Sequence, residues 1–152
     1  MHYGAEAILE EEAMALKATK AEVWAATIED RAGGAADKLE ALSRGGANLE
    51  MLLARRTDQP GQGVMFVTPV KGAKAVKAAQ EAGFGKPDTI HSVRVEGSDK
   101  PGLGSKIARA LGNAGVSFRG VSAVAIGSKF ISYIACDSAE DAAKAIGVLK
   151  KL

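Results

Sequence analysis

The feature of the sequence that most constrains the fold is an internal repeat. The stretch 21–88 and the stretch 89–152 carry the same pattern of apolar and turn residues at a shift of 69 positions, and after Gly127-Ser128 the shift falls to about 66 because the second hairpin is shorter. A repeat with one small gap indicates a duplicated domain. The equivalent pairs include Asp30 and Asp99, Gly33 and Gly102, Leu42 and Leu111, Gly46 and Gly115, and Leu49 and Phe118.

Each repeat contains the same order of predicted elements. Alternating apolar residues predict strands over 22–28, 48–54 and 64–68 in the first repeat and over 90–95, 121–126 and 130–135 in the second. Helical spacing predicts helices over 35–44, 72–82, 103–114 and 139–149. The order β-α-β-β-α predicts an α+β fold of two tandem ferredoxin-like domains, each an antiparallel sheet with its helices on one face.

Neither repeat shows a clear fourth strand. The segment from Pro87 to Val95 could form one long strand that serves both repeats, and the second repeat then keeps one open sheet edge. An open edge favours pairing with another chain or with the N-terminal arm.

The first twenty residues form a separate N-terminal piece in this interpretation. Apolar residues near helical spacing, with acids between them, predict a short amphipathic helix; they are Ala5, Ile8, Leu9, Ala13 and Leu16. A frayed arm, or added residues ahead of a natural start at Met14, are the alternatives. The predicted organisation is therefore an arm or helix over 1–20, a first domain over 21–88 and a second domain over 89–152.

The turn from strand to helix in each repeat has the chemistry of an anion site. Pro101 suits a first helical turn, and Gly102 and Gly104 lack the Cβ atoms that would hold a ligand away from the backbone. Free N–H groups at a helix N-terminus attract a carboxylate or a phosphate. Two structural alternatives stay open: the glycines only turn the chain, and Asp30 and Asp99 only cap helices.

The second repeat resembles the opening half of an ACT domain. The similarity lies in Asp99-Lys100-Pro101-Gly102 followed by a helix and by Asn113-Ala114-Gly115-Val116-Ser117-Phe118. The first repeat resembles it more loosely through Asp30-Arg31-Ala32-Gly33, where Ala32 replaces the proline of the motif. The resemblance covers 21–152 and implies small regulatory modules that often bind an amino acid, commonly between two modules. Such modules occur inside metabolic enzymes or as stand-alone tandem proteins, and we expect the stand-alone tandem form here.

The resemblance also implies which residues contact a ligand. It places the ligand against the loop after the first strand of a module and beside the polar residue that opens the second strand. The implied ligand-binding residues are Asp30, Gly33, Gly34, Asn48, Asp99, Gly102, Leu103, Gly104 and Ser117.

Composition excludes several other functions. One cysteine, Cys136, rules out an internal disulfide and suits a reducing compartment, and no apolar run is long enough for a membrane span, so we expect a cytoplasmic protein. The predicted central strands lack the aromatic platform of an RNA-binding sheet. The sequence predicts no metal site and no cofactor, and with only His2 and His91 it shows no catalytic set.

These observations favour a non-enzymatic sensor that binds an amino acid and passes its state to a partner protein. We expect a homodimer or higher homo-oligomer that forms through sheet edges, and no nucleic-acid or membrane partner. The alternative is a ligand-free assembly module, and a small enzyme is the weakest hypothesis.

Overall fold

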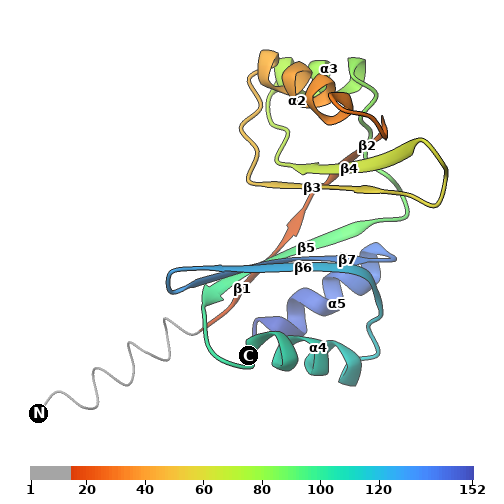
Figure 1. Cartoon of the computed structure of the whole chain (residues 1–152). Helices are drawn as coiled ribbons and strands as arrows, with labels where there is room; N and C mark the ends of the chain where they lie inside the picture. The colour runs from red at the N-terminus through yellow and green to blue at the C-terminus, as the bar shows by residue number, and fades with distance from the viewer. Residues whose placement is uncertain (1–14) are drawn as a thin grey trace, which may run out of the picture. The chain divides into compact units, whose positions relative to one another are not determined.

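The computed structural model describes residues 15–152 and divides this part of the chain into two compact units (Figure 1). The unit Glu22–Asp88 is continuous in sequence, and we call it the inserted unit. The other unit combines 15–21 with Thr89–Leu152, and we call it the split unit.

The inserted unit is a three-stranded antiparallel sheet with two helices. Its elements are β2 (Trp24–Glu29), α2 (Gly34–Arg44), β3 (Met51–Arg56), β4 (Gln62–Thr68) and α3 (Ala73–Glu81). The strand order is β2-β4-β3. A single bridge between Ala25 and Gly85 stands where a fourth strand would lie.

The split unit has four strands and two helices. Its elements are β1 (Lys17–Ala21), β5 (His91–Ser98), α4 (Leu103–Asn113), β6 (Phe118–Ile126), β7 (Lys129–Cys136) and α5 (Ala139–Leu149). The strand order is β1-β5-β7-β6, with every neighbouring pair antiparallel.

The sheet registers confirm the predicted α+β, ferredoxin-like fold. Leu52, Val67 and Trp24 lie side by side across the three strands of the inserted unit. Val121, Ile134 and Val93 do the same in the split unit. The 69-residue shift places Val121 on Leu52 and Val93 on Trp24, so the repeat in sequence is a repeat in register.

The fourth strand of the split unit comes from the N-terminal segment. Lys17 pairs with Glu96 and Ala21 pairs with Ser92, so the expected separate piece over 1–20 joins the second repeat where it is described. The helix expected there is wrong for 15–20, because 17–20 are strand and 15–16 are neither helix nor strand; residues 1–14 lie outside the described part of the chain. The pairing with β5 decides this conformation, because tertiary contacts override a weak helical pattern.

The long strand expected from Pro87 to Val95 is also wrong. The chain bridges Ala25 at Gly85, turns at 88–89, and begins β5 at His91. The long strand would have left one edge of β5 unpaired. In the structure β1 pairs with that edge.

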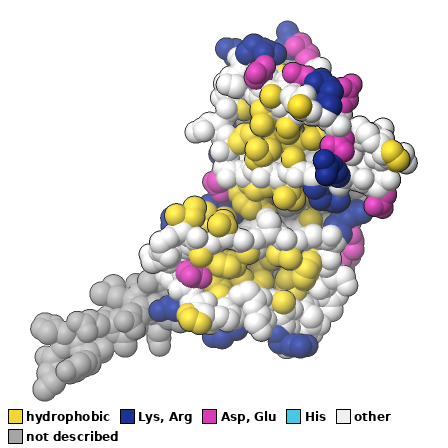
Figure 2. Space-filling model, in the orientation of Figure 1, with side chains coloured by type: hydrophobic (Ala, Val, Ile, Leu, Met, Phe, Trp, Pro, Cys, Tyr) yellow, Lys and Arg dark blue, Asp and Glu magenta, His cyan; other side chains and the backbone are white. Residues whose placement is uncertain are grey.

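Each unit has its own hydrophobic core between its sheet and its helices. The core of the split unit includes Val93, Val95, Leu111, Ile134 and Leu149. The core of the inserted unit includes Trp24, Leu42, Met65, Val67 and Ala79. Figure 2 shows hydrophobic side chains on the visible surface of both units as well. The large apolar side chains that stay exposed are Leu52 and Leu53 on β3, Phe118, Val121, Val124 and Ile126 on β6, and Leu152.

Candidate functional site

The turn between the first strand and the first helix has the same geometry in both units. The N–H of Gly34 donates to the carbonyl of Arg31, and the N–H of Leu103 donates to that of Lys100, both at 3.1 Å. Gly33 has φ 87° and ψ −11°, and Gly102 has φ 82° and ψ 5°. These angles define type II turns, which need a glycine-like residue at the third position. The turn forms with Ala32 in the inserted unit as well as with Pro101 in the split unit.

Both helices that follow these turns begin without a side-chain cap. The N–H groups of Gly34 and Leu103 are used by the turns, and the fourth N–H of each helix donates within it. Among the residues that the structure describes, no partner is found for the N–H groups in between, those of Ala35, Ala36, Gly104 and Ser105. The free N–H groups expected at both turns are therefore present.

Asp30 and Asp99 do not cap these helices. The N–H of Asp30 donates to Gly61 and that of Asp99 donates to Ser128 at 2.7 Å, so both residues tie the turn to the neighbouring hairpin. The Asp30 carboxylate also pairs with Arg56 at 2.9 Å. The Asp99 side chain is exposed.

Gly34 and Leu103 are equivalent positions with different environments. A Cβ on Gly34 would lie 2.2 Å from the carbonyl oxygen of Glu29, so this glycine permits a close approach of α2 to β2. Leu103 is 9% exposed and packs in the core of the split unit. The Leu103 side chain is therefore used in packing, although its backbone stays at the turn.

Asn48 and Ser117 are exposed and do not join the glycine turns within their own units. Each follows the far end of an 11-residue helix, about 16 Å from the turn that starts it. Asn48 instead lines a separate cleft of about 520 Å³ together with Gly46, Ala47, Leu49, Glu50, Pro69 and Lys71.

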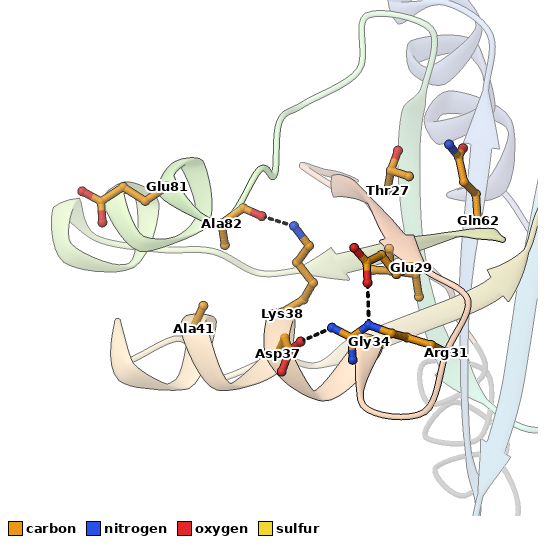
Figure 3. Close-up of a pocket in the computed structure, with 11 residues that line it drawn as sticks. Thr27, Glu29, Arg31, Gly34, Asp37, Lys38, Ala41, Gln62, Glu81 and Ala82 are labelled. Atoms are coloured by element: carbon orange, nitrogen blue, oxygen red, sulfur yellow. Dashed lines mark hydrogen bonds and ion pairs between the residues drawn. The ribbon is translucent and has the colours of Figure 1, made fainter.

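A cleft of about 520 Å³ opens beside the turn of the inserted unit (Figure 3). We call it the turn cleft. Backbone and side chains of β2, α2 and the end of α3 form its walls. Its lining residues are Thr27, Ile28, Glu29, Arg31, Gly34, Asp37, Lys38, Ala41, Gln62, Glu81 and Ala82.

Arg31 forms ion pairs on both sides of the turn in the inserted unit. Its guanidinium donates to Glu29 and, at 2.7 Å, to Asp37, as Figure 3 shows, and it also donates to the carbonyl of Ala32. Hydrogen bonds to Glu29 and Asp37 raise the pKa of Arg31 further above its usual value. Lys38 extends across the same cleft and donates to the Ala82 carbonyl at the end of α3.

The sequence analysis missed this network. Glu29, Arg31 and Asp37 show no helical or strand periodicity, and the turn alone brings them together. The signal that the sequence carries is the pair of acids, Glu29 and Asp37, that flank Arg31 across a glycine turn.

The turn of the split unit has a different charge pattern. The residues equivalent to Glu29, Arg31 and Asp37 are Ser98, Lys100 and Lys106. Lys100 and Lys106 are exposed, and a Cβ on Gly102 or Gly104 would have no atom within 4 Å. This turn is open to solvent, with free N–H groups between two lysines.

Among residues 15–152, no group of three or more His, Cys, Asp or Glu side chains could hold a metal ion. No helix in that range is long and apolar enough to cross a membrane. Cys136 is fully buried, and desolvation raises its pKa.

Comparison with solved structures supplies the relatives of this fold. Protein BT0572 from Bacteroides thetaiotaomicron aligns with a TM-score of 0.70 at 23% identity, over 89% of this chain and 90% of that one. The regulatory subunit of aspartate kinase from Thermus thermophilus, in a ligand-free form, aligns with a TM-score of 0.60 at 19% identity, over 90% and 97%. The chain is similar in fold to this regulatory subunit.

These likenesses show a shared fold. A third similar structure, E. coli aspartokinase III in complex with aspartate and ADP, has a TM-score of 0.56 at 12% identity, and the match covers 90% of this chain but 32% of that one. No protein-family model and no curated protein matches the sequence.

Proposed function

We propose that this chain is a regulatory protein that binds an amino acid, or a similar small zwitterion, and signals its presence to a partner protein. Its principal support is the open type II turn of the split unit, where the unpaired N–H groups of Gly104 and Ser105 lie between Lys100 and Lys106. The fold similarity to regulatory subunits of aspartate kinase agrees with this role.

The turn of the split unit suits both ends of a zwitterion. An α-carboxylate would accept hydrogen bonds from the free N–H groups, with Lys106 on the same first turn of α4. The exposed carboxylate of Asp99 would receive the ammonium group. We assign ligand binding to this turn first, because Arg31 at the equivalent turn is already paired with Glu29 and Asp37.

Ser117 can join this site only from another module, since it lies at the opposite end of α4 in its own unit. The resemblance to ACT domains implies such sites between two modules. The proposal therefore includes a homodimer or higher homo-oligomer formed through sheet edges.

Calorimetric titration of the full chain with each of the twenty amino acids tests ligand binding directly. Ser105→Asp would place a carboxylate of the protein at the free N–H groups, so we expect at least tenfold weaker binding. Ala36→Asp is the matched control, because it makes the same change at the equivalent position of the inserted unit. An acid in the first turn of a helix is favourable, so both variants should stay folded.

Two results would remove this proposal. One is the absence of both heat and thermal shift with every amino acid. The other is a Ser105→Asp variant that binds as tightly as the unmodified protein.

The second candidate is a ligand-free assembly module, which the exposed apolar side chains of β6 favour. Size-exclusion chromatography with and without the amino acids separates the two functions. A pure assembly module should elute at the same volume in both conditions and give no heat in the titration.

A further inference from the structure

The two helices of the inserted unit meet along a seam of small residues. These residues are Ala41 and Gly45 at the end of α2, and Ala78 and Ala82 at the end of α3. A Cβ on Gly45 would lie 2.4 Å from the Cβ of Ala78, so the glycine permits a close approach of the helices. A groove of about 400 Å³ runs along this seam, and we call it the helix groove.

The rim of the helix groove is basic. Its charged residues are Arg44, Lys74, Lys77 and Glu81. Lys77 and Glu81 pair at 3.9 Å on one face of α3. Arg44 and Lys74 are exposed, and neither has an ion-pair partner among residues 15–152. Lys and Arg side chains are visible over the helices of this unit in Figure 2. The groove therefore offers unpaired positive charge beside small side chains.

The split unit shows that the fold does not require these cations. The first repeat has three bases at the rim, Arg44, Lys74 and Lys77. The equivalent residues of the second repeat are Asn113, Glu140 and Ala143. Two copies of one fold therefore differ in charge at the same three positions, so the charge of the inserted unit serves a purpose other than packing.

We propose that the helix groove binds an acidic amphipathic helix of a partner protein. The proposal rests on the proposed function only for the existence of that partner. The small side chains at the seam let a third helix approach to the usual distance of about 8–10 Å between packed helix axes.

The spacing of the cations suits a helix with acids on one face. Lys74 and Lys77 are three residues apart on α3, so they lie on the same side of that helix. Glutamates three or four residues apart on a partner helix are separated by about 5–6 Å and would meet these two lysines. Arg44 lies on the other wall of the groove, because it comes from α2. An acidic helix would thus receive positive charge from both sides.

A nucleic acid is the less suitable partner for this surface. Among the described residues that line the groove, none is an aromatic residue on which a base could stack. Three cations are also few beside the roughly 6–10 phosphate contacts that DNA-binding proteins make. The groove therefore favours a peptide.

Fluorescence anisotropy of the full chain, without added amino acid, tests the groove. The probe is a labelled helical peptide of about 20 alanine and glutamate residues, with the glutamates on one face at spacings of three and four. A second peptide of the same composition has its glutamates distributed evenly around the helix. The first peptide should bind at least tenfold more tightly than the second.

A triple variant gives the helix groove the residues of the split unit. Its substitutions are Arg44→Asn, Lys74→Glu and Lys77→Ala. It should bind the first peptide at least tenfold more weakly than the unmodified protein. The matched control removes the same charge from exposed positions of the split unit through Arg109→Asn, Lys144→Glu and Lys150→Ala. The control should bind within twofold of the unmodified protein, and both variants should keep its circular dichroism spectrum.

Nuclear magnetic resonance locates the bound peptide independently. The amide resonances that shift on titration with the first peptide should be those of α2, α3 and the residues that cap their ends, Gly45 and Ala82. The amide resonances of the split unit should stay unchanged.

Four outcomes would overturn the proposal. Equal affinity for the two peptides, unchanged affinity in the groove variant, or shifts outside α2 and α3 would each do so. The fourth is tighter binding of a single-stranded oligonucleotide of about 20 nucleotides that the groove variant abolishes, since the groove would then be a nucleic-acid surface. Calorimetric titration of the groove variant with the amino acids should match that of the unmodified protein. The groove can therefore fail while the proposed ligand site survives, and the reverse.

Discussion

Gly34 approaches Glu29 so closely that a Cβ on the glycine would lie 2.2 Å from the Glu29 carbonyl oxygen. The neighbour is backbone at the end of β2, so it cannot move aside as a flexible side chain would. The contact fixes where α2 begins relative to the sheet, and therefore where the turn cleft opens.

Gly34→Ala should destabilise the inserted unit by about 2–3 kcal/mol, since the added methyl group overpacks against a backbone atom. Urea unfolding can be followed by the emission of Trp24, the single tryptophan, which is buried in that unit. Gly104→Ala is the control: its Cβ has open space and it lies in α4, so stability should be unchanged or rise by about 0.5–1 kcal/mol. Equal losses in the two variants would contradict the packing explanation.

Ser138 caps α5 by accepting a hydrogen bond from the N–H of Asp141 at 3.0 Å. Ser138→Ala should lower the free energy of unfolding by about 1 kcal/mol, because the N–H loses its partner. Thermal unfolding followed by circular dichroism measures the change. Ser105→Ala in α4 serves as the comparison and should cost less, since α4 has no side-chain cap. A Ser138→Ala variant as stable as the parent would show that water replaces the cap without loss.

Glu96 should make the split unit sensitive to acid. A hydrogen bond from Arg94, at 2.6 Å, lowers the pKa of Glu96 below its usual value. The pair therefore contributes stability above the unfolded-state pKa of glutamate, and this contribution is lost as pH falls through the lower folded-state pKa. Glu96→Gln should reduce stability at pH 7 by about 1 kcal/mol or less, and the difference from the parent should vanish once the pH falls below the lowered pKa of Glu96. If the stability difference between Glu96→Gln and the parent does not change with pH, the effect comes from packing and not from the charge of Glu96.

Cys136 should react with thiol reagents only when the split unit opens. The side chain is fully buried, and desolvation raises its pKa, so little thiolate forms at pH 8. Labelling with a disulfide reagent should follow the rate of unfolding in native buffer and be fast in concentrated urea. Rapid labelling of the native protein would show that β7 is accessible at its end.

The order of strands and helices could be predicted because both repeats alternate clearly between buried and exposed positions. The starts of β3 and β6 were less predictable. β3 begins at Met51 rather than 48, and β6 begins at Phe118 rather than 121. Both are edge strands whose side chains are mostly exposed, so burial leaves no alternation in their sequences.

The role of β1 was not predictable from its own residues. Lys17–Ala21 has the sequence KATKA, which has little strand propensity, and only its pairing with β5 makes it a strand. The ion pairs at the turn of the inserted unit could not be predicted for a similar reason. Arg31 meets Glu29 and Asp37 through the geometry of a glycine turn, so the acids on either side of Arg31 indicate the network only once the turn itself is known.

The bridge between Ala25 and Gly85 has a consequence for how the chain folds. β1 and β5 are neighbours in one sheet although a whole unit separates them in sequence. Once the inserted unit has formed, the bridge holds its two ends together with hydrogen bonds of 2.8 and 2.9 Å. Closing β1 onto β5 then spans roughly ten flexible residues instead of about seventy, which lowers the entropy cost by about 2 kcal/mol. The split unit should therefore assemble after the inserted unit has folded. Synthesis follows the same order, because Glu22–Asp88 is complete before most of the split unit has been made.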